Sequence, residues 1–290
     1  ATDGSFYPHH VPIKASNGYD IRPQLWFNLA DNGTYTVLAD GKGTLSIVQY
    51  SPDHFTSEKF EYSFTNGTTF TFTTKDLTIP DNSGYPATTG SGPGGMGTTS
   101  MWLEITQSDS LNPVRNIRML PPDYTDSKGV VHHFADEYKT RMFHPKLIED
   151  MQKYTIIRFM DLCHTNNSKV KYWKQTRQLN ELGSGSIPYI DMITLGNEAN
   201  RDIWLNIPHQ ASNGFINTLA NLIRLNLKPG LKAYIEYSNE VWNGIFDQAG
   251  WAEQQGMILG WSDNSGGKYY VRRSSEIFKR FENVFATERN

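Results

Sequence analysis

The feature that most constrains the fold is a repeated alternation of short apolar strands and helical stretches in the second part of the chain. Strands are predicted at 114–120, 154–160, 203–207 and 231–237, and helices at 146–153, 188–200, 215–227, 246–259 and 269–287. The strands follow one another at a spacing of about 30 to 45 residues, which leaves room for a crossover helix between parallel neighbours. We therefore expect about four strand–helix units, forming either half of an eight-fold (β/α) barrel or a small open sheet.

Residues 1–112 differ in texture, because they are rich in Thr, Ser, Gly and aromatic residues and show no helical period. The turns that contain Gly41 and Gly67 each separate two alternating strands, which predicts two hairpins, since glycine supplies the positive φ that tight turns require. Further strands are predicted at 24–29 and 99–107. The expected fold class is α/β plus all-β. An antiparallel β-sandwich would cover 1–112 and a partial barrel 113–290.

Composition excludes several classes of function. The chain has 290 residues and a formal net charge of -3, and no basic cluster predicts binding to nucleic acid or to an anionic membrane. No apolar run approaches the roughly 20 residues that span a bilayer. The single Cys163 cannot form an internal disulfide. The segment 90–97 has the glycine spacing of a dinucleotide site, but a strand follows it instead of the helix that such a site requires.

Two features favour an extracellular protein. The chain begins at Ala1, as a processed product would, and it contains three N-x-S/T sequons, at Asn32, Asn66 and Asn166. We therefore expect secretion, with these asparagines as candidate glycosylation sites. A histidine pair in the sequence His132-His133 lies near acidic residues, but its spacing matches no recognised metal site. We predict neither a metal nor a cofactor.

Polar and aromatic residues gather where three of the predicted strands end. The carboxyl ends of parallel strands meet at one edge of a sheet, and in barrel enzymes that edge builds the active site. Candidate binding residues are Arg158, Asp161, His164 and Asn166 after the second strand, Trp204, Asn206 and His209 on and after the third, and Tyr237, Asn239, Glu240 and Trp242 at the fourth.

Each of these residues also has a structural interpretation. Arg158 could simply pair with Asp161, and His209 could cap a loop. His164 and Asn166 could belong to an ordinary polar loop. Glu240 could lie in the first turn of a helix that begins directly after the strand.

Longer motifs in the second part of the chain resemble a known clan. They are Arg158-Phe-Met-Asp161, Thr165-Asn-Asn-Ser168, Trp204-Leu-Asn-Ile-Pro-His209 and Glu236-Tyr-Ser-Asn-Glu-Val-Trp-Asn243. This part resembles the (β/α)8 glycoside hydrolases that include the family-5 cellulases. It is most similar to secreted cellulase-like proteins that carry an N-terminal β-domain. The resemblance covers about 112–285 and is weaker over the N-terminal third.

The resemblance implies roles for individual residues. Glu240 would be the general acid/base, and Asn239 would contact the sugar 2-hydroxyl. Arg158 and His209 would line the cleft, with Trp204 or Trp242 as stacking surfaces. A retaining glycosidase also needs a second carboxylate, about 5 to 5.5 Å from the first, as nucleophile. In the clan that nucleophile ends the seventh strand, so we expect it to lie outside this chain.

Two functions remain open at this point. The first is a secreted glycoside hydrolase acting on a β-linked polysaccharide. The second is an extracellular structural or glycan-binding protein that keeps the barrel without catalysis. In both, the expected partner is a polysaccharide or oligosaccharide. Because a half barrel exposes strand edges, we also expect self-association or association with the rest of the barrel.

Overall fold

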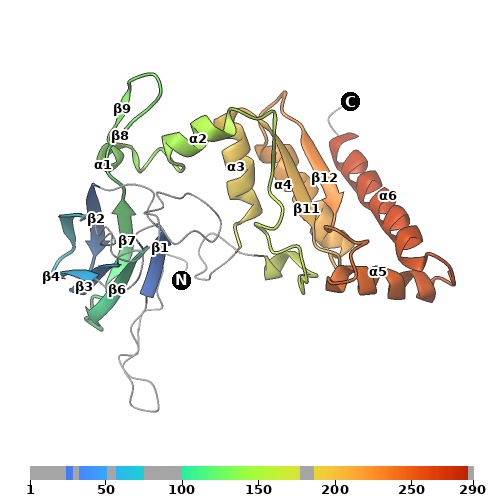
Figure 1. Ribbon diagram of the computed structural model, residues 1–290, viewed down its shortest axis with the longest axis horizontal. Helices are drawn as coiled ribbons and strands as arrows, with labels where there is room; N and C mark the ends of the chain where they lie inside the picture. The colour runs from blue at the N-terminus through green and yellow to red at the C-terminus, as the bar shows by residue number, and fades with distance from the viewer. Residues whose placement is uncertain (1–23, 29–32, 51–56, 75–99, 177–185, 287–290) are drawn as a thin grey trace, which may run out of the picture. The chain divides into compact units, whose positions relative to one another are not determined.

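The computed structural model describes residues 24–28, 33–50, 57–74, 100–176 and 186–286. The chain is a mixed α/β protein that divides into two compact units, Ala1–Met142 and Phe143–Asn290 (Figure 1). The glycine-rich segment 90–97 and the sequon at Asn32 lie outside the described residues. Among the described residues, none of the helices combines the length and the apolar character needed to cross a bilayer.

The first unit contains two antiparallel sheets that share one hydrophobic core. One sheet has the order β1-β6-β3-β4 and the other β5-β2-β7. The core is built by strands of both sheets, and its residues Val37, Leu45 and Ile47 have no exposed surface. These antiparallel sheets agree with the all-β character expected for this part of the chain. The strands are β1 (Gln24–Asn28), β2 (Thr34–Asp40), β3 (Gly43–Tyr50), β4 (Ser57–Phe64), β5 (Thr68–Thr73), β6 (Ser100–Ser108) and β7 (Arg115–Leu120).

Both predicted hairpins are wrong, because each turn carries the chain from one sheet to the other. β2 pairs with β5 and β7, whereas β3 pairs with β4 and β6. Gly41 has a φ of 91°, and a Cβ there would overlap the carbonyl oxygen of Pro113. The Gly67 amide donates a hydrogen bond of 2.7 Å to the Gly41 carbonyl. Both glycines therefore lie in corners where the chain crosses from one sheet to the other, and the two corners contact each other. Alternating strands flank such corners and hairpin turns alike, so the sequence pattern does not distinguish the two.

The strand predicted at 114–120 belongs to the first unit and does not begin the α/β domain. It is β7, which pairs antiparallel with β2. The same unit continues through the short strands β8 (Tyr124–Thr125) and β9 (Val131–His132) and the helix α1 (Phe134–Glu137). The compact units consequently divide after residue 142, where the sequence placed the division after residue 112.

Within its described residues, the second unit contains three parallel strands in the order β10-β11-β12, where four had been expected. The described residues contain no closed barrel. The predicted helices are present close to their expected bounds. The elements are α2 (Pro145–Met151), β10 (Ile156–Arg158), the 3-10 helix η1 (Trp173–Gln175), α3 (Tyr189–Ala199), β11 (Asp202–Ile207), α4 (Asn213–Asn226), β12 (Ala233–Tyr237), α5 (Asp247–Ile258) and α6 (Ser265–Ala286).

Side chains along β11 point alternately to the two faces of the sheet, and this decides which of them are available to a site. Ile203, Leu205 and Ile207 have no exposed surface and pack in the core with residues of α3, α4 and α6. Trp204 and Asn206 therefore point to the opposite face of the sheet, since successive side chains alternate. Any site on this sheet must be built on that opposite face.

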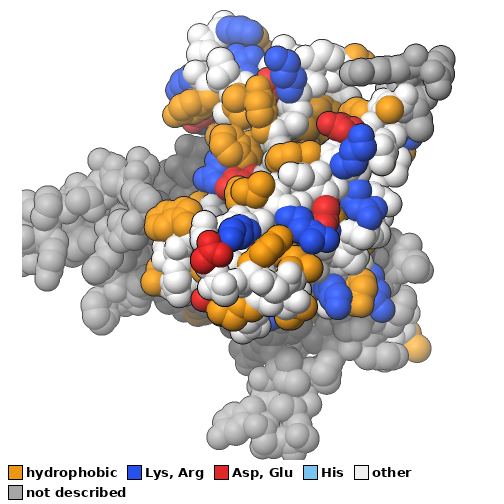
Figure 2. Space-filling view, turned by 90° about the vertical axis from the view of Figure 1, so that its right-hand side faces the viewer, with side chains coloured by type: hydrophobic (Ala, Val, Ile, Leu, Met, Phe, Trp, Pro, Cys, Tyr) orange, Lys and Arg blue, Asp and Glu red, His pale blue; other side chains and the backbone are white. Residues whose placement is uncertain are grey.

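The outer edge of β12 is bordered by an apolar groove, which we call the β12 groove. It has a volume of about 920 Å³ and is lined by residues of α4, β12 and α6, including Tyr234, Phe278 and Phe285. The two phenylalanine side chains are 46% and 40% exposed. Figure 2 shows this side of the molecule, where apolar side chains alternate with Lys and Arg.

Candidate functional site

The register of the parallel strands brings polar side chains into two neighbouring rows. Arg158 of β10 lies opposite Trp204 of β11, and Asn206 of β11 lies opposite Glu236 of β12. Residues that face each other in a register lie on the same side of a sheet, so all four share the face opposite the helices. The structure thus places Arg158, Trp204 and Asn206, three of the candidate binding residues predicted from the sequence, on one face of the sheet.

Glu236 is the centre of this face. Its Oε2 accepts hydrogen bonds of 2.9 Å from the Arg158 guanidinium, from Nε1 of Trp204 and from Nδ2 of Asn206. The guanidinium also lies 5.0 Å from the centre of the Trp204 ring, a distance at which cation–π attraction acts. We call these four residues the Glu236 network. Charge-assisted hydrogen bonds hold its carboxylate in one place and compensate its charge.

Glu236 was not among the site residues predicted from the sequence. The signal was present, because a carboxylate occurs inside an apolar strand two residues after Tyr234. A charged residue at such a position is rarely buried unless it is paired. The residues predicted from this stretch of the sequence were instead Asn239 and Glu240, which follow the strand.

The turn after β12 has an unusual backbone. Ser238 and Glu240 have φ values of 58° and 43°, in the left-handed region that non-glycine residues rarely adopt. Between them, Asn239 is 3% exposed. Its Oδ1 accepts a hydrogen bond of 3.0 Å from Arg158, and its Nδ2 donates one of 3.1 Å to Oδ1 of Asn166. Asn239 therefore links the turn to the Glu236 network, and such backbone strain is concentrated at functional sites.

Gln248 is a second residue that the sequence did not reveal. It has no exposed surface, and its Nε2 donates to Oδ1 of Asn166 (2.7 Å) and to the carbonyl of Asn239 (2.8 Å). It lies in the first turn of α5, which begins at Asp247. Glu240 precedes that helix by several residues, so its interpretation as a first-turn residue is wrong.

Glu240 lies at a pocket of about 760 Å³ that also receives Glu236, Trp242 and Tyr270. We call it the Glu240 pocket. Oε2 of Glu240 accepts a hydrogen bond of 2.9 Å from Nδ2 of Asn243. The Trp242 side chain is 82% exposed. The pocket thus combines three carboxylates, those of Glu236, Glu240 and Glu253, with an indole ring that is open to solvent.

Three further predicted residues, Asp161, His164 and Tyr237, are not part of the Glu236 network. Arg158 pairs with Glu236 and not with Asp161, whose Oδ1 accepts a hydrogen bond of 2.9 Å from the backbone amide of Asn166 and so orders the loop. His164 is exposed, with a φ of 52°. Tyr237 is 1% exposed and packs in the helix-side core.

His209 is 2% exposed and faces a different pocket. Its carbonyl accepts a hydrogen bond of 3.0 Å from the Tyr237 hydroxyl. The ring itself packs edge to face on Trp251, with 5.8 Å between ring centres.

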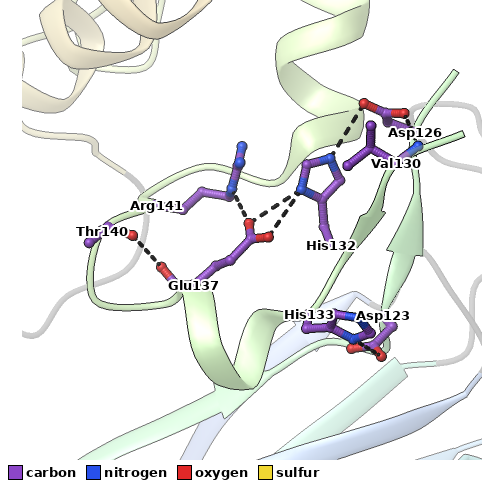
Figure 3. A network of polar contacts seen from close by, with 8 residues as sticks. All are labelled: Asp123, Asp126, Val130, His132, His133, Glu137, Thr140 and Arg141. Carbon is purple, nitrogen blue, oxygen red and sulfur yellow. Dashed lines mark hydrogen bonds and ion pairs between the residues drawn. The ribbon is translucent and has the colours of Figure 1, made fainter. Parts of the chain in front are cut away.

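The histidine pair of the first unit is engaged with separate carboxylates (Figure 3). Nδ1 of His132 lies 3.3 Å from Glu137 and its Nε2 3.5 Å from Asp126, whereas Nδ1 of His133 lies 2.7 Å from Asp123. In the described part of the chain, no group of three or more His, Cys, Asp or Glu side chains is placed to hold a metal ion.

Comparisons with known proteins add little to this geometry. No family model matches the sequence, and no curated protein matches it. One solved structure that matches is "Bacteroides uniformis beta-glucuronidase 2 covalently bound to cyclophellitol-6-carboxylate aziridine", with 10% identity and a TM-score of 0.23. The match covers 91% of this chain but only 32% of that one. At that TM-score the likeness, although to a glycoside hydrolase, defines neither the fold nor the function of this chain.

Proposed function

We propose that the chain is part of a secreted, glycoside hydrolase-like protein that acts on a β-linked polysaccharide. Glu240 is the acid/base of a retaining, two-carboxylate mechanism, and the nucleophile is supplied from outside this chain. One observation carries the proposal: the ends of three parallel strands join Arg158, Trp204 and Asn206 to Glu236, at the same pocket as Glu240.

The Glu240 pocket has the chemistry that a sugar ring requires. Carboxylates can accept hydrogen bonds from hydroxyl groups. The exposed Trp242 offers a flat, amphipathic surface on which the apolar face of a pyranose can lie. The exposed Asn66, on the first unit, is accessible for glycan attachment, which supports the proposed secretion.

Glu236 is poorly suited to be the nucleophile. One of its oxygens accepts three hydrogen bonds, including one from a guanidinium, and these interactions hold the carboxylate in one place and occupy that oxygen. We assign Glu236 to positioning. We therefore infer that the second carboxylate lies on further strands outside this chain. These strands would pair with the outer edge of β12, next to the β12 groove.

In the full-length protein, Glu240→Gln should lower the turnover of β-linked polysaccharide by about 10²- to 10⁴-fold, because the leaving oxygen loses its proton donor. The loss of kcat/KM should be much smaller for 2,4-dinitrophenyl β-glycosides, whose leaving group needs no proton, because this ratio does not include the later hydrolysis step in which Glu240 acts as base. Values of kcat/KM on both substrates measure the difference.

The control is Glu61→Gln on β4, whose side chain is 51% exposed and outside the Glu240 pocket; its rates should equal those of the wild type. Undiminished hydrolysis of polysaccharide by Glu240→Gln would refute the assignment.

A second function is favoured by a specific observation. Asn239 is buried with both side-chain groups engaged, and Glu236 is fully compensated. Such a site suits binding without turnover. The alternative is therefore a non-catalytic extracellular structural or glycan-binding protein. Retention of a labelled oligosaccharide without any hydrolysis, by the full-length protein, would select this alternative, whereas a measurable turnover would reject it.

A further inference from the structure

One carboxylate at the Glu240 pocket, that of Glu253, is not used by the proposed function. Ala249, Glu253 and Met257 follow one another at intervals of four residues on α5, so they lie on one face of this helix, and all three line the pocket. The helical neighbours that could pair with Glu253 are Ala249, Gly250, Gly256 and Met257, and none of them carries a charge. Among the described residues, Glu253 has neither a hydrogen-bond partner nor an ion-pair partner.

The other charges at this pocket are already paired or used. Glu236 is compensated by the Arg158 guanidinium, and Glu240 protonates the leaving oxygen in the proposed mechanism. Among the described residues that line the pocket, none is a Lys or an Arg. Lys268, which follows the lining residues on α6, pairs with Asp263 at 2.7 Å. The described lining therefore carries a net negative charge, and a cleft lined by one sign of charge attracts ligands of the opposite sign.

The pocket suits an organic cation better than a metal ion. In the described part of the chain, the carboxylates of Glu236, Glu240 and Glu253 are not grouped so that they could hold a metal ion together. The pocket has a volume of about 760 Å³, and the Trp242 side chain is 82% exposed. The face of an indole ring attracts cations. A ligand that carries an ammonium group on a ring with an apolar face can therefore use both the free carboxylate and the indole.

We propose that the Glu240 pocket selects a β-linked polysaccharide of amino sugars, and that Glu253 determines this specificity. The ammonium group of one glucosamine unit pairs with Glu253, and a sugar ring lies on Trp242. A sugar that carries a carboxylate, such as a uronic acid, is repelled. The identity of the ligand as a sugar rests on the proposed function, whereas the uncompensated charge of Glu253 does not.

The test compares β-1,4-linked trimers of glucosamine, glucose and N-acetylglucosamine. Sulfur replaces each linking oxygen, so the full-length protein cannot cleave them. The trimers differ only at C2, which carries an ammonium, a hydroxyl or an acetamido group. In isothermal titration calorimetry at about pH 6, where the amine is protonated, the glucosamine trimer should bind about tenfold more tightly than the glucose trimer. The N-acetylglucosamine trimer, whose nitrogen is uncharged, should lack this advantage.

Added salt provides a further measurement on the same ligands. A higher NaCl concentration should reduce the advantage of the glucosamine trimer over the glucose trimer, because salt screens an ion pair that is open to solvent. The affinity for the glucose trimer should not change with salt, because that ligand has no charge.

Three variants assign the selection to Glu253. Glu253→Gln keeps the size of the side chain and removes its charge, so the advantage of glucosamine over glucose should fall to about threefold or less, with the affinity for the glucose trimer unchanged. Glu253→Asp keeps the charge and should retain most of the advantage. Glu61→Gln removes one charge outside the pocket, from a side chain that is 51% exposed, and should leave the advantage as it is in the wild type.

The outcomes separate this inference from the proposed function. Equal affinity for the glucosamine and glucose trimers, or an undiminished advantage in Glu253→Gln, overturns the selection and leaves the proposed function standing. A glucosamine advantage in a protein that hydrolyses no β-linked polysaccharide supports the selection and overturns the proposed catalysis. Binding of trilysine as tight as that of the glucosamine trimer would mean that charge alone is recognised, which overturns the selection of a sugar. If no trimer binds, both proposals fall.

Discussion

At the residue scale, the burial of His209 makes the stability of the fold depend on pH. Its pKa is lowered from 6.5 to about 4 in the folded protein, chiefly because burial disfavours the charged ring. Between these two values the unfolded chain binds more protons than the folded one. The free energy of unfolding is therefore unaffected above about pH 6.5, and it falls as the pH falls toward 4.

We predict that this loss reaches as much as about 1.4 kcal/mol per pH unit within that window. His209→Gln should remove this part of the slope, because glutamine does not titrate. His164→Asn, at an exposed position, should keep the wild-type slope. Urea unfolding between pH 4.5 and 7 measures all three proteins, and an unchanged slope in His209→Gln would contradict the assignment.

The residues of the candidate site could be predicted from the sequence only in part. Arg158, Trp204 and Asn206 were found because polar residues at strand ends are visible in the sequence. Glu236 and Gln248 were missed, because their importance arises from distant partners, which lie 30 to 78 residues away for Glu236 and include Asn166, 82 residues away, for Gln248. Local sequence carries no signal of such a partner.

At the element scale, the close packing of α5 on α6 depends on one glycine. A Cβ added at Gly256 would overlap the carbonyl oxygen of Ser265, at the start of α6, whereas one added at Gly250 of the same helix meets nothing. Both positions are helical, so alanine gains about 1 kcal/mol of helix propensity at either of them.

We predict opposite effects for this matched pair. Gly250→Ala should raise the free energy of unfolding by about 0.5 to 1 kcal/mol. Gly256→Ala should lower it by about 1 to 3 kcal/mol, because overpacking against backbone outweighs propensity. Thermal unfolding followed by circular dichroism compares the two, and a stabilised Gly256→Ala protein would mean that the helices can separate without cost.

Helices were predictable and strand pairing was not. The period of 3.6 residues is a local property, so the positions of α3 to α6 followed from the sequence. Pairing is not local: the strands on either side of Gly41 alternate as hairpin strands do, yet they join different sheets. The corner is specified by the close approach of Pro113, which lies far along the chain.

At the scale of the whole molecule, the second unit leaves a strand edge and an apolar groove uncovered. β12 is the last strand of the described sheet, and Phe278 and Phe285 border its groove in exposed positions. Such edges promote pairing with other chains. The expectation of a barrel came from counting strand–helix units, and one of the four counted strands belongs to the other unit.

We predict that the chain associates with itself as its concentration rises. Phe278→Ser should weaken this association, because it removes apolar surface from the β12 groove. Ile258→Ser removes a side chain that is 76% exposed and lies outside the groove, so it should have little effect. Sedimentation velocity over a concentration series measures both, and a wild-type chain that stays monomeric throughout would contradict the prediction.

The alternation of sheets in the first unit has a kinetic consequence. The chain changes sheet after β1, β2, β4, β5 and β6, so neither sheet can be completed before the other is nearly formed. β1, for example, must wait for β6, about 75 residues later. Loops of this length must close before their contacts contribute stability, which places folding in about the millisecond-to-second range. During that delay, the growing first unit presents unpaired β-strands to every neighbouring chain.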